Sequence, residues 1–162
     1  MLREFTVEDA AGIFALNSNP DVMQHTGVAL MQNVNEAQDF INGYTEYADY
    51  GYGSWACVLK QSGDFIGAFG LRYRPQQNIV TIGGLFLPAY WGKGYATEAT
   101  VACLNYAFKE LDIASVSAFC NINNLASIAI LEKLGFAKTG TFEDKGNTVL
   151  IYQIEKEQWR IR

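Results

Sequence analysis

The chain has 162 residues, 49% of them hydrophobic and 14% aromatic, which is the size and composition of one globular domain spanning residues 1–162. A domain of this length buries roughly two-thirds of its unfolded surface, so it does not need a disulfide or a metal in order to fold. The net charge of −5 argues against direct nucleic-acid binding, which depends on a basic surface, and no segment approaches the roughly 18 consecutive apolar residues of a membrane-spanning helix.

The first half of the chain predicts two helices followed by three strands. Thr6 and Asp9 are cap residues for a helix over residues 7–17, and a second helix is predicted over residues 34 to about 49. We expect the strands after them to form an antiparallel meander. Aromatic and β-branched residues predict these strands over residues 54–59, 65–73 and 79–87, with turns at residues 61–64 and 74–78.

The second half predicts helices alternating with strands. A helix is expected over residues 98–108, a strand over 115–120, a helix over 126–134 that ends at Gly135, and a final strand over 149–155. The two halves together predict an α/β (α+β) fold in which helices flank a mixed, mainly antiparallel central sheet.

Cysteine and histidine content limits the chemistry. The three cysteines, Cys57, Cys103 and Cys120, have no paired spacing, which predicts reduced thiols. His25 is the only histidine, so we expect no metal site. The N-terminal segment lacks the apolar core of a secretory signal peptide, and we therefore expect a cytoplasmic protein.

Residues 91–97, Trp-Gly-Lys-Gly-Tyr-Ala-Thr, form the most informative segment, which we call the glycine loop. It lies between a predicted strand and a predicted helix. The first turn of a helix leaves N–H groups unpaired at the positive end of the helix dipole, and glycines let an anion approach that backbone. The loop is a candidate pyrophosphate site, although Gly92 and Gly94 would also suit a tight connection that binds nothing.

Two other phosphate motifs are excluded by particular residues. In the ATP-binding P-loop, Ser or Thr follows the Gly-Lys pair, whereas Gly94 follows it here, and no glycine lies five residues before Gly92. The dinucleotide-binding fingerprint needs a third glycine where this chain has Thr97. The glycine loop therefore matches neither motif.

A second motif lies downstream, where Asn124 and Ser127 precede the run Leu-Glu-Lys-Leu-Gly-Phe at residues 131–136. With these motifs in this order, the chain resembles the GNAT superfamily of acetyl-CoA-dependent N-acetyltransferases, especially the branch of ribosomal-protein N-terminal acetyltransferases. The similarity covers nearly the whole chain. It implies that acetyl-CoA is the co-substrate and that the strand before the glycine loop splays away from the strand at 115–120, which leaves a gap for the pantetheine arm.

The resemblance also implies which groups hold acetyl-CoA. Main-chain groups of Leu85, Phe86 and Leu87 would pair with pantetheine, and one N–H there would polarise the thioester carbonyl. The pair Gly83-Gly84 suggests a bulge or a close backbone approach in this strand. Trp91 stands where the superfamily usually has Gln or Arg, so one side-chain phosphate contact is in doubt. The remaining residues expected at the pyrophosphate are Gly92, Lys93, Gly94, Tyr95, Ala96 and Thr97.

Ser127 is the candidate catalytic residue. It lies one helical turn after Asn124 at the start of a helix, so both side chains can face acetyl-CoA. The resemblance implies that Asn124 bonds the pantetheine amides and that Ser127 donates to the departing thiolate. Both residues would also suit plain capping and first-turn roles, with Asn123 as an alternative cap.

The general base is unknown. An amine must lose its proton before it attacks a thioester, and the related branch typically uses a Glu that Thr81 replaces here. Water with backbone carbonyls is one alternative. A side chain from another segment is the other, and the candidates are Tyr44, Asp49 and His25.

The charge distribution bears on the acceptor. Residues 1–81 hold nine acidic and four basic groups, whereas residues 82–162 hold eight of each. Because the early helices wall the acceptor side in GNAT folds, their carboxylates favour a cationic amine, although ordinary solvated helix faces would give the same pattern. We favour the α-amine of a protein or peptide, acetylated by direct transfer in a ternary complex. The alternatives are a small cationic amine (a polyamine, amino acid or aminoglycoside) and a non-catalytic acyl-CoA-binding sensor, and exposed aromatic residues would make a homodimer unsurprising.

Overall fold

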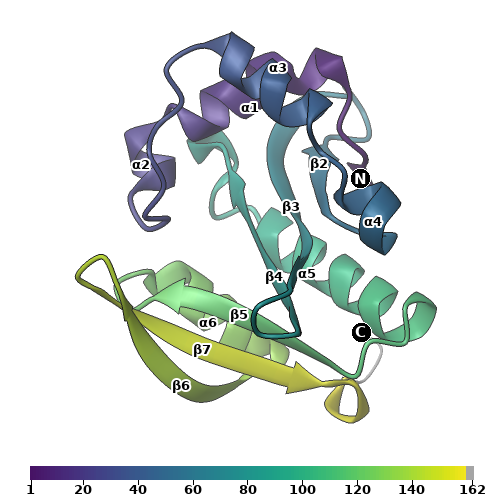
Figure 1. Cartoon of the computed structure of the whole chain (residues 1–162), viewed down its shortest axis with the longest axis vertical. Helices are drawn as coiled ribbons and strands as arrows, with labels where there is room; N and C mark the ends of the chain where they lie inside the picture. Colours follow the sequence, from purple (N-terminus) through teal and green to yellow (C-terminus); the bar gives the residue numbers. More distant parts are fainter. Residues whose placement is uncertain (160–162) are drawn as a thin grey trace.

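The computed structural model describes residues 1–159, which form one seven-stranded sheet with helices on both faces (Figure 1). The strands are β1 (Leu2–Arg3), β2 (Ser54–Val58), β3 (Phe65–Arg74), β4 (Ile79–Phe86), β5 (Ser115–Asn121), β6 (Ala137–Asp144) and β7 (Asn147–Glu155). The helices are α1 (Ala10–Asn17), α2 (Pro20–Met23), α3 (Val34–Asn42), α4 (Glu46–Tyr50), α5 (Tyr95–Asn105) and α6 (Leu125–Leu134). Short 3-10 or π turns lie at Val7–Asp9, Pro88–Tyr90, Tyr106–Glu110 and Lys156–Gln158. Across residues 1–159, no helix combines the length and apolarity needed to cross a membrane.

β4 and β5 part from each other in the middle of the sheet. The strand order is β1-β2-β3-β4-β5-β7-β6, and all neighbours are antiparallel except β4 and β5, which are parallel. These two strands pair only at Thr81 and Ser117, although β4 continues to Phe86 and β5 to Asn121. We call the space between residues 82–86 and 118–121 the β4–β5 opening. The predicted mixed, mainly antiparallel sheet with a splayed strand pair is confirmed.

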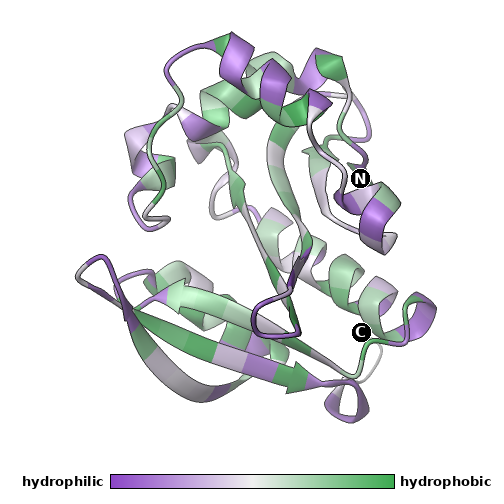
Figure 2. Cartoon of the chain, viewed as in Figure 1, coloured by the Kyte–Doolittle hydropathy of each residue, from purple (hydrophilic) through white to green (hydrophobic). Residues whose placement is uncertain are grey.

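The side chains of β3 alternate between two layers of helices. Phe69 and Leu71 pack in the larger core with α5, whereas Ala68 packs with side chains of α1 and α2. We call the side of the sheet that carries Ala68 the α1 face and the opposite side the α5 face. The turns that join β3 to β4 and β6 to β7 are hydrophilic (Figure 2).

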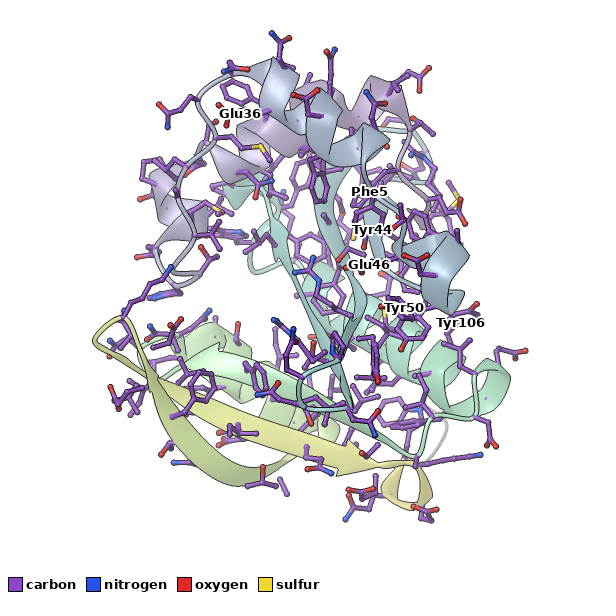
Figure 3. All side chains as sticks on the ribbon, viewed as in Figure 1. Phe5, Glu36, Tyr44, Glu46, Tyr50 and Tyr106 are labelled. Atoms are coloured by element: carbon purple, nitrogen blue, oxygen red, sulfur yellow. The ribbon has the colours of Figure 1, made fainter. Side chains whose placement is uncertain are left out.

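The single helix predicted over residues 34–49 is wrong, because the chain forms α3 and α4 with a break at residues 43–45. Gly43, a poor helix former, ends α3. In the break, Tyr44 accepts a hydrogen bond from the Ser54 N–H at 2.6 Å and donates to Glu46 at 2.8 Å. Its ring packs edge-on against Phe5 at 5.3 Å between centroids (Figure 3). These tertiary contacts outweigh the helical pattern of the sequence.

The other predicted helices and strands are present with ends that move by at most three residues, and the helix over residues 7–17 begins with a 3-10 turn. Two strands and one α-helix were not predicted. β1 has only two residues, and α2 is a four-residue helix capped by the Asn19 side chain. β6 lies at the sheet edge, where seven of its eight residues are exposed, so it lacks the apolar alternation that reveals a half-buried strand.

Candidate active site

The glycine loop leads directly into the first turn of α5. The helix begins at Tyr95 rather than at the predicted residue 98, and the carbonyl of Gly94 accepts its first intrahelical bond at 3.0 Å. The N–H groups of Tyr95, Ala96 and Thr97 therefore have no main-chain acceptor among residues 1–159. Three unpaired donors at the positive end of a helix dipole suit a phosphate group.

Two glycines keep the approach to these donors open. Gly92 and Gly94 have φ angles of +70° and +87°, which other residues rarely adopt, and a Cβ built on either would meet no heavy atom within 4 Å. The Lys93 ammonium lies 5.5 Å from the ring centroid of Tyr90, where it adds positive charge to the same loop. The loop therefore has the geometry expected of a pyrophosphate site.

The Trp91 side chain forms a hydrogen bond that could not be predicted from the sequence. Its indole N–H donates to the main-chain carbonyl of Phe86 at 2.6 Å, and the residue remains 47% exposed. The side chain thus fixes the start of the glycine loop to the end of β4. The Gln or Arg usual at this position would offer a phosphate contact, which this indole N–H does not provide while it is bonded to Phe86.

Phe86 directs main-chain groups into the β4–β5 opening. The neighbouring Leu87 faces β3, because its N–H donates to the Ile66 carbonyl at 2.9 Å. In an antiparallel pair, such residues alternate with residues whose N–H and C=O point away from the partner strand. Leu85 therefore also faces β3, whereas Gly84 and Phe86 face β5. Of the three residues expected at pantetheine, only Phe86 presents main-chain groups to the opening, and Gly84 joins it.

Gly84 must be glycine for a structural reason, whereas Gly83 has room for a side chain. β3 and β4 pair in unbroken register, so the suggested bulge is absent between these strands. The suggested close approach is present at Gly84, where a Cβ would lie 2.2 Å from the Ala68 carbonyl oxygen. At Gly83 a Cβ would meet no heavy atom within 4 Å, so the α1 face of β4 is open at this residue.

Asn124 and Ser127 form the cap of α6. The Asn124 side-chain oxygen accepts a hydrogen bond from the Ser127 main-chain N–H at 3.1 Å. The Cys120 thiol on β5 donates to the Asn124 main-chain carbonyl at 3.7 Å; burial raises the pKa of this thiol, and the nearby Ser127 side chain offsets part of that rise. The capping alternative is therefore confirmed for Asn124. It leaves the Asn124 amide N–H groups and the Ser127 hydroxyl available to a ligand.

The Thr81 hydroxyl, at the point where β4 and β5 separate, is not free to act as a general base. Its buried hydroxyl donates to the Arg72 carbonyl at 3.2 Å and accepts from Arg74 Nε at 3.4 Å. The Arg74 guanidinium also lies 5.8 Å from the ring centroid of Phe119 on β5. Arg74 was predicted as a turn residue, and no local signal in the sequence could have paired it with Phe119.

The three other candidate bases have separate environments. Tyr44 lies in the break between α3 and α4, where burial raises its pKa. Asp49 accepts a hydrogen bond from the Thr45 hydroxyl at 2.7 Å within the same segment. His25 is half-buried in the turn that follows α2. The structure does not bring these residues together into one proton-transfer group.

Several carboxylates of the early segments already have protein partners. Asp9 pairs with Arg3 at 2.7 Å, and Glu46 pairs with Arg72 at 3.3 Å. Glu36 accepts hydrogen bonds at the start of α3, from the main chain of residue 32 and the side chain of residue 33. Several of the carboxylates that were expected to attract a cationic acceptor are therefore already paired or hydrogen-bonded within the fold.

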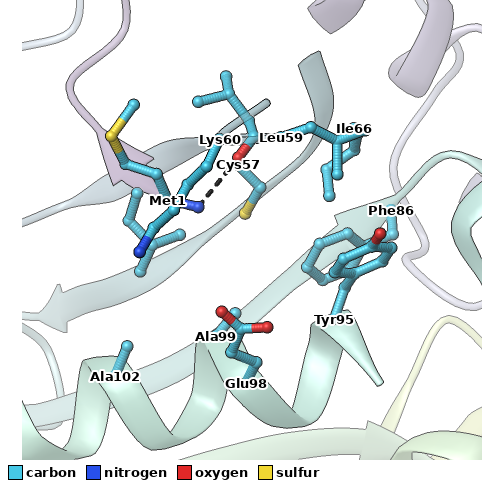
Figure 4. Close-up of a pocket in the computed structure, with 12 residues that line it drawn as sticks. Met1, Cys57, Leu59, Lys60, Ile66, Phe86, Tyr95, Glu98, Ala99 and Ala102 are labelled. Carbon is cyan, nitrogen blue, oxygen red and sulfur yellow. Dashed lines mark hydrogen bonds between the residues drawn. The ribbon is translucent and has the colours of Figure 1, made fainter. Parts of the chain in front are cut away.

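A cavity of about 510 Å³ lies between β1, β2 and the first turns of α5, and its lining also includes Phe86 at the end of β4 (Figure 4). Cys57, Tyr95 and Glu98 contribute to its lining. Burial raises the pKa of Cys57 to about 12, so its thiol is not a ready nucleophile at neutral pH. The main-chain groups of Gly84 and Phe86 face the β4–β5 opening, on the side of β4 that is turned away from β3.

The chain has relatives among known proteins. Residues 1–137 match the model of a family described as an acetyltransferase (GNAT) domain. The chain is 31% identical over 157 residues to the uncharacterized protein YkkB of Bacillus subtilis strain 168, which covers 94% of this chain and 90% of that protein. The putative ribosomal N-acetyltransferase YdaF of the same strain is 28% identical over 108 residues, or 62% of this chain and 59% of that protein.

Solved structures show the same architecture. A GNAT-family acetyltransferase from Bacillus anthracis superposes with a TM-score of 0.84 at 25% identity, covering 96% of this chain and 94% of that one. The spermidine N-acetyltransferase of Vibrio cholerae, solved in complex with CoA and spermine, gives a TM-score of 0.83 at 19% identity and covers 98% of this chain and 96% of that one. At that identity the likeness shows the fold.

Proposed function

The chain belongs to the GNAT acetyltransferase family and is an acetyl-CoA-dependent N-acetyltransferase; we propose that it transfers the acetyl group directly to the α-amine of a protein or peptide. The observation that carries the site assignment is the junction at Phe86. There the open, donor-rich glycine loop is bonded through Trp91 to the strand that borders the β4–β5 opening. One extended ligand with a phosphate end and a thioester end fits both features.

Acetyl-CoA supplies an acetyl group activated as a thioester, and the chain supplies its binding and polarisation. The unpaired N–H groups of Tyr95, Ala96 and Thr97 would hold the pyrophosphate. The pantetheine arm would lie in the opening, beside Phe86 and the amide group of Asn124. The N–H groups of residues 84 and 86 then face the thioester oxygen, where fixed donors stabilise developing negative charge without reorganising.

Proton transfer in this proposal uses water on the amine side and Ser127 on the sulfur side. The neutral amine nitrogen forms a bond to the acetyl carbon, the carbon–sulfur bond breaks, and water removes the proton that the nitrogen loses. Because the Thr81 hydroxyl is already hydrogen-bonded, we assign this proton transfer to water, which a main-chain carbonyl such as that of Gly84 would orient. Ser127 donates a proton to the departing thiolate and is reprotonated from solvent.

The α-amine is favoured by the motif resemblance and by the similarity to YdaF, a putative ribosomal N-acetyltransferase. A small cationic amine is the alternative, favoured by the structural likeness to the spermidine acetyltransferase. A non-catalytic acyl-CoA sensor is the third candidate, because Thr81 replaces the glutamate expected as the general base.

The three candidates separate in one acceptor screen. Purified protein and acetyl-CoA are incubated with peptides that have free or blocked N-termini, with polyamines and with aminoglycosides, and released CoA and acetylated products are measured. We expect CoA release with free N-termini and none with the blocked peptides. Release with polyamines alone would establish the alternative, and binding of acetyl-CoA without release would establish the sensor.

Self-association is a separate proposal. Trp91 and Phe142 expose 47% and 39% of their surfaces, as expected if apolar side chains meet a second copy. We propose a homodimer, and light scattering of the purified protein measures it directly. A mass of about 18 kDa per particle would contradict the proposal.

A further inference from the structure

Arg72 and Arg74 have the same charge on the same strand but different surroundings. They alternate with Tyr73, so both lie on the α1 face of β3. Arg72 forms an ion pair with Glu46 at 3.3 Å. For Arg74, no carboxylate among residues 1–159 lies within ion-pair distance.

The Arg74 side chain reaches across β4 at the apex of the β4–β5 opening. It contacts Thr81 on β4 through Nε at 3.4 Å and the ring of Phe119 on β5 at 5.8 Å. Thr81 is the last residue at which β4 and β5 still pair. The guanidinium is therefore held in front of the point where the two strands separate, on the face that is open at Gly83.

This arrangement leaves the outer part of the guanidinium for a ligand. An arginine has five N–H donors in a planar fork, and only the Nε donor of Arg74 has an acceptor within the described part of the chain. Burial, and secondarily the nearby Arg72, lower the pKa of Arg74, which shows that the site disfavours its positive charge. An anionic partner would relieve this penalty, and a planar carboxylate matches the two remaining nitrogens in bidentate geometry.

We propose that Arg74 binds a carboxylate carried by the acceptor, so that the substrate class is a primary amine with a nearby carboxylate. This inference rests on the proposed acetyltransferase site and specifies its acceptor. The carboxylate belongs either to a free amino acid or to an acidic first residue of a peptide, which share the same chemistry. A polyamine brings only positive charge to Arg74 and is disfavoured.

The test compares acceptors that differ only in the carboxylate. One arm uses L-alanine against L-alaninamide, and the other uses C-terminally amidated tripeptides that begin with aspartate or asparagine. We expect the wild type to favour the acid over its neutral partner by roughly 10- to 100-fold in kcat/KM in one arm, mainly through KM. Arg74→Gln should reduce this ratio to about 1, and Arg74→Lys should retain part of it because it keeps the charge without the fork.

Arg72→Gln is the matched control, because it removes the same charge two residues away, and the Arg72 guanidinium is already paired with Glu46. The acid-to-neutral ratio of this variant should match that of the wild type. The inference would be overturned if the acid preference survives in Arg74→Gln. It would also be overturned if the wild type prefers spermidine or shows no acid preference. Each of these results leaves the acetyltransferase assignment in place. Binding of acetyl-CoA, measured by thermal shift, without CoA release with any amine would overturn both. If Arg74→Gln does not fold, Phe119→Leu offers a second variant, expected to lower the ratio by loosening the guanidinium.

Discussion

The indole N–H of Trp91 donates to the main-chain carbonyl of Phe86 across 2.6 Å. This bond joins the first residue of the glycine loop to the last residue of β4. It satisfies a carbonyl that points toward the β4–β5 opening and holds the loop in a fixed position relative to that opening. The phosphate end and the thioester end of the proposed site are thus connected by one side chain.

Replacing Trp91 with Phe should weaken acetyl-CoA binding by about 2- to 10-fold, as expected for the loss of one hydrogen bond. Isothermal titration calorimetry measures this change. Trp159→Phe is a matched control, because its indole N–H donates to Asn105 at 2.9 Å, away from the loop. That variant should lose stability and keep the wild-type affinity; equal affinity in the Trp91 variant would show that the bond does not position the loop.

Gly94→Val should abolish the thermal shift that acetyl-CoA produces, because the new side chain stands where the anion approaches. In the wild type, ligand at 100 times its dissociation constant stabilises the fold by about 2.7 kcal/mol. Valine at a φ of +87° is also strained, so the variant needs a control with the same strain. Gly63→Val provides it, since Gly63 has a φ of +79° and equally open surroundings in the turn before β3. A shift that persists in folded Gly94→Val would contradict the phosphate assignment.

Ser127→Ala should lower turnover by roughly 10²- to 10⁴-fold and leave acetyl-CoA affinity nearly unchanged, as expected for a positioned proton donor. The substitution preserves the helix cap, because Asn124 accepts its bond from the main-chain N–H of residue 127. Asn124→Ala is the complementary variant and should cost about 1 kcal/mol of stability. Undiminished turnover in Ser127→Ala would reduce this serine to a first-turn residue.

The glycine loop and the cap of α6 could be predicted because their chemistry is local. Gly92, Gly94 and Asn124 act through backbone conformation and helix termini, and both leave a signal within a few consecutive residues. The contacts of Arg74 and Trp91 depend on how strands meet in three dimensions. No periodicity in the sequence could indicate that Arg74 crosses β4 to reach Phe119, which lies 45 positions along the chain.

Asp9 should make stability depend on pH in the acid range. Burial raises its pKa, but the paired Arg3 guanidinium at 2.7 Å and the Thr6 N–H outweigh this effect, so the net pKa is lowered. A lowered folded-state pKa stabilises the fold above the unfolded value of about 3.9, and this contribution is lost as pH falls through the folded value. Asp9→Asn should therefore cost about 1–3 kcal/mol at pH 7 and progressively less below about pH 4. Urea unfolding at pH 7 and below about pH 4 measures the free energy of unfolding. Asp21→Asn, at an exposed residue, is the control and should change this free energy little.

Direct transfer, without an acetylated cysteine, is the last prediction, and Cys120 is the residue that tests it. This thiol is buried on β5 beside the opening, where it could receive the acetyl group before the amine does. A nucleophilic cysteine must be a thiolate, which requires a lowered pKa, whereas burial raises the pKa of Cys120 despite the opposing effect of the nearby Ser127 side chain. The thiol is thus protonated at neutral pH, and direct attack needs only a neutral amine held near the thioester. Cys120→Ala should retain most of the activity, and initial-rate kinetics should give intersecting lines. Parallel lines with an acetylated Cys120 trapped in the wild type would contradict direct transfer and leave the acetyl-CoA site standing.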